Sequence, residues 1–216
     1  MIGTLEWATY PRLLEHSYFE WTRKLREMEE RLHTPIPDSL HWTRRFEYPW
    51  ILYNLFRNEP AHRTLIDVGS GATALQFLIS VQQPGWGVTS IDPDLAAVAW
   101  INSRGHPQNP VSRLGGFPVL PFNCDRFDIG ICISVLEHLP KEQVLPSIRE
   151  LLRVSRKEVL ITMDVALGKK HPTQVDYSDL QQICTTLDLE VPERDRSITF
   201  QMNDYMFGVA CLHLAK

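Results

Sequence analysis

Apolar residues recur at helical spacing in two segments before residue 57. From Leu13 to Leu32 they form one stripe, which predicts an amphipathic helix. The prolines at positions 35 and 37 end that pattern, and the spacing predicts a second helix from Tyr48 to Phe56.

After residue 63 short apolar runs alternate with helical stretches. The runs predict strands at Thr64–Val68, Gly87–Ile91, Phe127–Val135 and Glu158–Val165. The stretches predict helices at Ala72–Gln82, Asp94–Ser103, Lys141–Val154 and Tyr177–Leu187. This alternation is typical of a doubly wound α/β fold, a mostly parallel sheet with helices on both faces. Two further runs, Glu190–Thr199 and Met206–Leu214, predict an antiparallel hairpin at a sheet edge.

Composition narrows the class of protein. The 216 residues carry 22 Lys plus Arg against 26 Asp plus Glu, so no basic field indicates a nucleic-acid partner. The four cysteines form no C-x-x-C pair, which indicates neither a disulfide framework nor a zinc site and favours a reducing, cytoplasmic setting. No apolar run approaches the roughly 20 residues that a membrane-spanning helix needs.

The stretch from Thr64 to Ala74 carries the clearest chemical signal, because an apolar strand leads there into a glycine turn and a helix. Gly69 and Gly71 permit a tight turn and close approach of a ligand, and the start of the helix presents free N–H groups. The spacing G-x-G-x-x-A also matches a dinucleotide-binding loop.

Two acids favour a ligand with a cationic group over one with a pyrophosphate. Asp67 precedes Gly69 by two positions, where a carboxylate would repel a pyrophosphate and attract an ammonium or sulfonium. Asp92 ends the second predicted strand, the position from which an acid binds ribose hydroxyls. Alternatively, Asp67 satisfies loop amides and Asp92 caps the helix that starts at Pro93.

Four motifs follow one another along the chain: the loop at 67–71, the Ser90-Ile-Asp92-Pro-Asp94 strand end, the segment from Phe127 to Pro140 with Ser134-Val-Leu-Glu137-His138, and the helix ending at Val154. Together they resemble a class I S-adenosylmethionine-dependent methyltransferase of the small-molecule type 11 kind. The resemblance covers about residues 60 to 165. It implies a Rossmann-like, mostly parallel seven-stranded sheet with an antiparallel C-terminal hairpin, and S-adenosylmethionine as cofactor.

The resemblance also assigns residues. It implies that Asp67 and the glycine loop hold the methionine end of the cofactor, Asp92 the ribose, and the strand mouth at Ser134 the sulfonium. The cofactor-binding residues implied in this way are Asp67, Gly69, Ser70, Gly71, Asp92, Pro93, Ser134 and Val135. Glu137 and His138 would face the substrate.

The sequence departs from the family pattern at two places. Thr73 replaces the third glycine of the loop, which suggests a different turn. Gly115 and Gly116 stand where the family often has an acid for the adenine amino group. Backbone groups and an apolar clamp of Pro93, Leu114 or Phe117 would then hold adenine.

Methyl transfer from a sulfonium needs alignment more than chemical assistance. His138 is the candidate general base, because an imidazole titrates near neutrality. It could instead bond loop backbone or cap the helix that follows. The other histidines show no metal-ligand spacing, so no metal is predicted.

Four of the six Trp and four of the six Tyr lie before residue 54. We therefore divide the chain into residues 1–62, a helical lid or substrate segment, and residues 63–216, the cofactor-binding domain. Trp21 and Trp42 could line an acceptor pocket, and Arg45 or Tyr48 could meet the methionine carboxylate. Alternatively, these aromatic residues are the core of a helical appendage or the face of a homodimer.

The leading hypothesis is a methyltransferase that acts on a small-molecule acceptor. A nicotinamide-dependent oxidoreductase is the alternative enzyme, supported by the glycine spacing and opposed by Asp67. A pseudoenzyme or interaction module that binds the cofactor without turnover is the third class.

Overall fold

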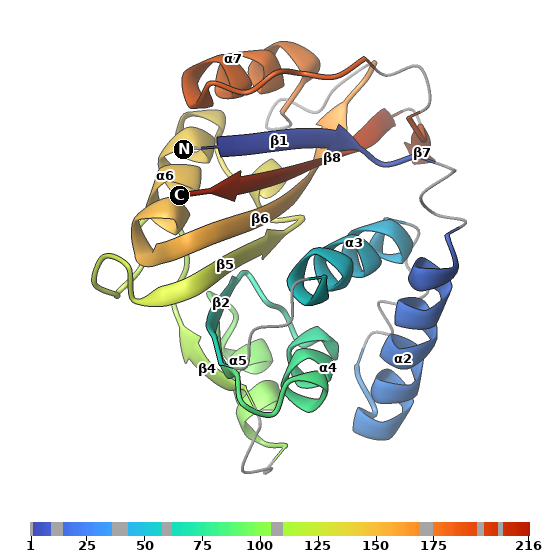
Figure 1. Ribbon diagram of the computed structural model, residues 1–216, viewed down its shortest axis with the longest axis vertical. Coiled ribbons are helices and arrows are strands. Elements are labelled where there is room, and N and C mark those ends of the chain that lie inside the picture. The colour runs from blue at the N-terminus through green and yellow to red at the C-terminus, as the bar shows by residue number, and fades with distance from the viewer. Residues whose placement is uncertain are drawn as a thin grey trace.

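The computed structural model of the chain describes residues 2–9, 15–35, 43–57, 62–104, 110–168, 175–193, 197–202 and 205–216. A single sheet of order β1-β8-β6-β5-β2-β3-β4, with β7 paired to β8, runs through it (Figure 1). Its strands are β1 (Ile2–Trp7), β2 (Thr64–Val68), β3 (Gly87–Asp92), β4 (Val111–Leu114), β5 (Phe127–Ile133), β6 (Ser155–Ala166), β7 (Phe200–Met202) and β8 (Tyr205–Ala215). From β6 to β4 every neighbouring pair is parallel, whereas β1, β6 and β7 pair with β8 antiparallel. The predicted fold class is confirmed.

Helices cover both faces of this sheet (Figure 1). Their bounds are α2 (His16–Leu32), α3 (Arg44–Phe56), α4 (Leu75–Gln82), α5 (Leu95–Asn102), η2 (Leu136–His138), α6 (Lys141–Val154) and α7 (Tyr177–Leu187). Side chains of α2, α3, α4 and α5 share one buried cluster with Ile129 and Ile131 of β5. Those of α6 and α7 share a second cluster, on the opposite face, with Cys132. β5 is buried along its whole length and is apolar apart from Asp128, which is the pattern of a central parallel strand.

The predicted hairpin was wrong in its first strand. Within the described residues of 190–199 there is no strand, and the partner of β8 is the short β7. β1 occupies the edge of β8 from Ala210 to Ala215, and Pro192 has no N–H to give to a sheet ladder. The Pro192 carbonyl instead accepts a hydrogen bond from the Trp7 indole.

Besides β7, two strands were not anticipated by the hydrophobic pattern. β1 lies in the N-terminal segment, for which we expected helices, and only Leu5 and Trp7 of its six residues are buried. β4 is an edge strand with three of four residues exposed, so it has no apolar run. The segment before residue 63 therefore contributes to the sheet as well as to the helices.

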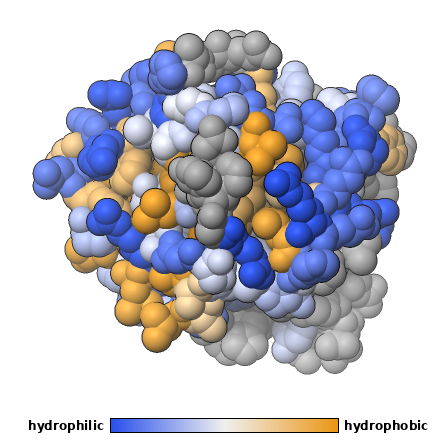
Figure 2. All heavy atoms as spheres, turned by 90° about the horizontal axis from the view of Figure 1, so that it is seen from below, coloured by the Kyte–Doolittle hydropathy of each residue, from blue (hydrophilic) through white to orange (hydrophobic). Residues whose placement is uncertain are grey.

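The β4 edge carries apolar side chains that the chain itself leaves uncovered. Leu95, Leu114 and Val119 are each more than half exposed. Figure 2 views the molecule from the α4 and α5 end and shows hydrophobic patches between hydrophilic ones. Among the described residues, no helix has the length and apolar character needed to cross a membrane.

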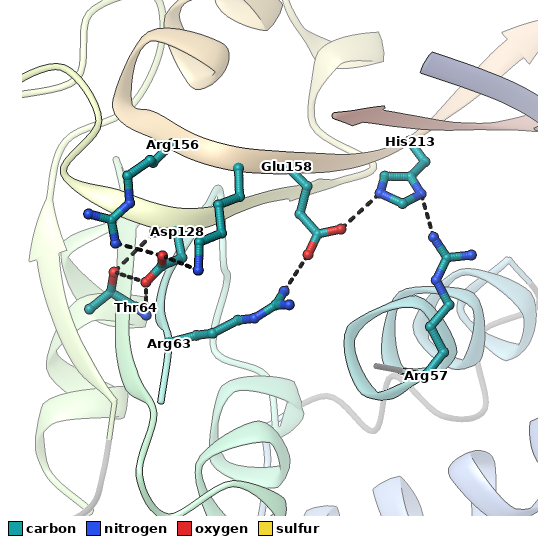
Figure 3. A network of polar contacts seen from close by, with 8 residues as sticks. Arg57, Arg63, Thr64, Asp128, Arg156, Glu158 and His213 are labelled. Carbon is teal, nitrogen blue, oxygen red and sulfur yellow. Dashed lines mark hydrogen bonds and ion pairs between the residues drawn. The ribbon is translucent and has the colours of Figure 1, made fainter. Parts of the chain in front are cut away.

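Ion pairs lie at the end of the sheet where the parallel strands begin (Figure 3). Asp128 accepts hydrogen bonds from the Thr64 amide and hydroxyl and pairs with Arg156 at 2.7 Å. Glu158 pairs with Arg63 and with His213. Hydrogen bonds and ion pairs between side chains therefore connect β2, β5, β6 and β8 at this end of the sheet.

Candidate functional site

A cavity of about 240 Å³ opens at the carboxyl ends of β2 and β5. These two strands are neighbours at the point where the strand order reverses, which is where doubly wound sheets bind ligands. Its lining residues are Pro35, Arg44, Tyr48, Asp67, Gly69, Ser70, Gly71, Ala72, Thr73, Leu75, Gln76, Ile133 and Ser134. The predicted glycine loop and α3 thus meet in one place.

The glycine loop needs residues without a side chain. Gly69 and Gly71 have positive φ angles of 74° and 57°. A Cβ on Gly69 would lie 2.3 Å from Cγ2 of Val135, so the loop after β5 packs directly on the glycine. Val135 therefore supports the loop, and it is not among the residues that line the cavity.

Asp67 is a buried acid that faces this cavity. Its side chain accepts a hydrogen bond from Gln76 Nε2 at 2.5 Å. Burial above all, helped by the Asp92 charge, raises the pKa of Asp67 to about 7, although the hydrogen bond from Gln76 and the Arg44 charge act to lower it. A cationic ligand group would shift Asp67 toward its ionised form.

Asp92 ends β3 and holds the loop in place. Its Oδ2 accepts a hydrogen bond from the Gly71 amide and its Oδ1 one from the Asp94 amide, both at 2.8 Å. The alternative role as helix cap is filled by Asp94, whose side chain accepts from the Ala96 amide at the start of α5. Asp92 keeps further lone pairs for a ligand hydroxyl.

A buried acid on α3 ties the helix to the strand ends. Glu47 Oε1 accepts hydrogen bonds from the hydroxyls of Ser134 and Thr162, both at 2.6 Å, and Glu47 Oε2 pairs with Arg44. Ser134, with a φ of 49°, closes β5 in the left-handed region. Arg44 thereby lines the cavity, whereas the predicted Arg45 is exposed and lies outside the lining.

Arg44 and Glu47 were not predicted as site residues. The three-residue spacing of an arginine and a glutamate on one helix is a weak signal, since most such pairs lie on solvated faces. Tyr48, which was predicted, lines the cavity, with the Arg44 guanidinium 5.6 Å from its ring centre.

Glu137 and His138 follow β5 on η2, outside the cavity lining. Glu137 is buried, and burial together with the charge of Glu47 raises its pKa to about 8. His138 is exposed, yet partial desolvation and the charge of Arg44 lower its pKa. At pH 7 the His138 ring is therefore mostly neutral and able to accept a proton.

Trp21, one of the two predicted aromatic substrate residues, does not line the cavity. Trp21 packs against Phe56, with ring centres 5.1 Å apart, and Lys24 lies over it. This is the packing expected of a helical core. Trp42 lies outside the described residues.

The loop after β4 returns to the end of β3. The Gly115 amide donates to the Asp92 carbonyl at 3.0 Å, and a Cβ on Gly116 would make ordinary contact with Pro93. Pro93 and Leu114 are exposed, whereas Phe117 packs against the core. Of the three predicted clamp residues, two present free apolar surface.

Comparison with known proteins identifies the class. The family described as "Methyltransferase domain" matches residues 66–163. A search of curated proteins finds no match. The resemblance inferred from the motifs is confirmed: the chain has the domain and fold of a class I S-adenosylmethionine-dependent methyltransferase, and S-adenosylmethionine is the cofactor of this class.

Solved structures share the fold at low identity. A SAM-dependent methyltransferase from Aquifex aeolicus is 17% identical with a TM-score of 0.55, over 86% of this chain and 96% of that one. Magnesium protoporphyrin IX methyltransferase from Synechocystis PCC 6803, solved with bound SAM, is 14% identical with a TM-score of 0.51, over 92% and 97%. The [4+2]-cyclase SpnF is 15% identical with a TM-score of 0.56, over 80% and 72%.

The residues of the cavity fit this cofactor. Ser70 Oγ is buried in the glycine loop and has no hydrogen-bond partner among the described residues, so it can donate to a ligand carboxylate. The cavity is lined by this donor, by Arg44 and by the acid Asp67. Such a lining suits a ligand that carries both a carboxylate and an ammonium at one end. No group of His, Cys, Asp and Glu suited to a metal occurs within the described part of the chain.

Proposed function

We propose that the chain binds S-adenosylmethionine with its methionine end in the cavity and transfers the methyl group to a small-molecule acceptor. Asp67 holds the ammonium, Ser70, Arg44 and Tyr48 the carboxylate, and Asp92 the ribose hydroxyls. The buried Asp67 beside two left-handed glycines carries this proposal. Pro93 and Leu114 offer apolar surface to adenine.

The cofactor supplies a methyl group already activated by the sulfonium. In-line displacement then requires that the acceptor nucleophile be aligned with the methyl carbon, and such alignment accounts for most of the rate enhancement. The hydrogen bonds that Ser134 and Thr162 donate to Glu47 hold β5 and β6 in place around the sulfonium position.

The acceptor enters beside η2, where Glu137 and His138 lie. His138 takes the proton of an acceptor that keeps it at neutral pH, since its lowered pKa leaves the ring unprotonated there.

We also retain as proposals the division at residue 62, a lid role for the N-terminal helices, a cytoplasmic setting, a homodimer through the aromatic segment and the absence of a nucleic-acid partner.

Titration calorimetry tests the cofactor assignment. We expect S-adenosylmethionine and S-adenosylhomocysteine to bind the wild-type protein, and Asp92→Ala to weaken binding at least tenfold. Asp94→Ala is the matched control, because that carboxylate caps α5 and has no proposed ligand contact. Tight binding of NADH without binding of either sulfur compound would favour the oxidoreductase instead.

Turnover needs a separate test, since the same fold occurs in a [4+2]-cyclase. Labelled S-adenosylmethionine with panels of amines, phenols, carboxylates and thiols should give methylated product with one acceptor class. Cofactor binding without transfer to any panel would favour the pseudoenzyme.

A further inference from the structure

The loop residue that departs from the family pattern, Thr73, takes part in a hydrogen-bond chain to Asp67. The Thr73 hydroxyl contacts Gln76 Oε1 at 3.1 Å and the Ser70 carbonyl at 3.4 Å. Gln76 Nε2 donates to Asp67 Oδ2 at 2.5 Å and to the Ser70 carbonyl at 3.2 Å. Gln76 is fully buried and lines the cavity.

This chain fixes the orientation of the Gln76 amide. The Asp67 carboxylate and the Ser70 carbonyl can only accept, so the NH₂ group of Gln76 must face them. Gln76 Oε1 then faces Thr73, whose hydroxyl donates to it. Both protons of that NH₂ group are used, one on the acid and one on the loop carbonyl. The remaining oxygen of Asp67 is left for the cavity.

We propose that Gln76, held in place by Thr73, is a positioning residue that orients the Asp67 carboxylate toward the ammonium group of the cofactor. The inference rests on the proposed function, which assigns that ammonium to Asp67. Thr73, which stands where the family has a glycine, then does more than change the turn, because its hydroxyl holds Gln76.

A hydrogen bond to the ionised acid also favours that charge state. Without the Gln76 donor, the pKa of Asp67 should rise above its present value of about 7. The substitution leaves unchanged the other groups that face Asp67, which are the Asp92 carboxylate, the Arg44 guanidinium and the Cys132 thiol. A ligand ammonium should therefore bind less well to the variant at low pH, and the loss should shrink as pH rises.

Calorimetric titration with S-adenosylhomocysteine from pH 6 to pH 8 tests this. The variants are Gln76→Leu and Thr73→Val. The matched control is Gln82→Leu at the other end of α4, where the amide oxygen accepts a hydrogen bond from Lys24 Nζ. If Asp67 becomes a tenfold weaker acid, the Kd ratio of Gln76→Leu to wild type is about nine at pH 6 and about two at pH 8. Thr73→Val should show the same trend, with a ratio of about two to three at pH 6, and Gln82→Leu a ratio near one.

The possible results separate this inference from the proposed function. A wild-type protein that does not bind S-adenosylhomocysteine contradicts both. Wild-type binding with Kd ratios near one, or with a loss of affinity that is the same at every pH, overturns only the role of Gln76. Thr73→Val changes a half-buried residue in the loop, so the test holds even where Gln76→Leu fails to fold.

Discussion

At the scale of single residues, the glycine loop makes the sharpest demand on side-chain size. Gly69→Ala would place a Cβ into Val135 and keep an alanine at a φ that costs about 1–2 kcal/mol for a residue with a side chain. We expect at least a tenfold loss of affinity for S-adenosylhomocysteine and a lower free energy of unfolding.

Gly87→Ala provides the control for that substitution. Its Cβ would lie 3.6 Å from Thr64 Cγ2, an ordinary contact, at the start of β3 and away from the cavity. Equal affinities for the two alanine variants would contradict the role given to Gly69.

The raised pKa of Asp67 predicts pH-dependent binding. A ligand ammonium favours the ionised acid, so affinity should rise as pH passes through about 7. Between pH 6 and pH 7.5 we expect the Kd of S-adenosylhomocysteine to fall about eightfold for a single group of this pKa. Asp67→Asn should bind weakly and without this dependence; a wild-type Kd that stays constant over the range would contradict the assignment.

Local signals decided which site residues could be predicted. Asp67, Gly69, Gly71 and Asp92 lie at or just after the ends of apolar strands, and the structure places their loops together at the carboxyl ends of β2 and β3. Arg44 and Glu47 reach these strand ends only through the packing of α3, which no spacing within the helix reveals.

At the scale of elements, α7 shows how a local motif sets a helix boundary. Asp176 accepts from the Asp179 amide and Asp179 accepts in turn from the Asp176 amide, a reciprocal cap that starts the helix at Tyr177 as predicted. Asp176→Ala should lower the free energy of unfolding by about 1 kcal/mol, measured by urea denaturation.

Ser178→Ala is the control, since its exposed hydroxyl donates to Asp176 and supplies no cap of its own. Cofactor affinity should be unchanged in both variants, because α7 lies on the face of the sheet opposite α3. A stability loss as large for Ser178→Ala as for Asp176→Ala would contradict the capping role.

Elements were predictable in proportion to their burial. β2, α6 and α7 have the predicted bounds, because a buried face imposes a regular pattern of apolar residues. β4 has three exposed residues of four, and β7 has only three residues, so neither shows a regular apolar pattern. β1 pairs with residues far along the chain, such as Ile2 with Ala215. The mistaken strand at 190–199 has the same cause, since its place beside β8 is taken by β1.

At the scale of the whole molecule, the ion pairs of Figure 3 predict that the stability of the fold is sensitive to acid. Burial alone would raise the pKa of Asp128, but hydrogen bonds from Arg156, the Thr64 amide and Lys157 outweigh it and hold the pKa below its usual value. A lowered pKa means that Asp128 contributes stability above about pH 4, where the unfolded acid is ionised, and that this is lost as pH falls further.

Asp128→Asn should therefore lower the free energy of unfolding by about 1–3 kcal/mol at pH 7, and the difference from wild type should shrink toward pH 3. Guanidinium denaturation at a series of pH values measures both quantities. A difference that is the same at pH 3 and pH 7 would show that the charge of Asp128 does not contribute.

The central claim is that the cavity at the carboxyl ends of β2 and β5 holds the methionine end of the cofactor. A crystal structure with S-adenosylhomocysteine tests it most directly. We predict the ligand amino group within hydrogen-bond distance of Asp67, the ribose hydroxyls on Asp92 and the sulfur facing Ser134. A ligand bound elsewhere, or one whose amino group points away from Asp67, would contradict the account.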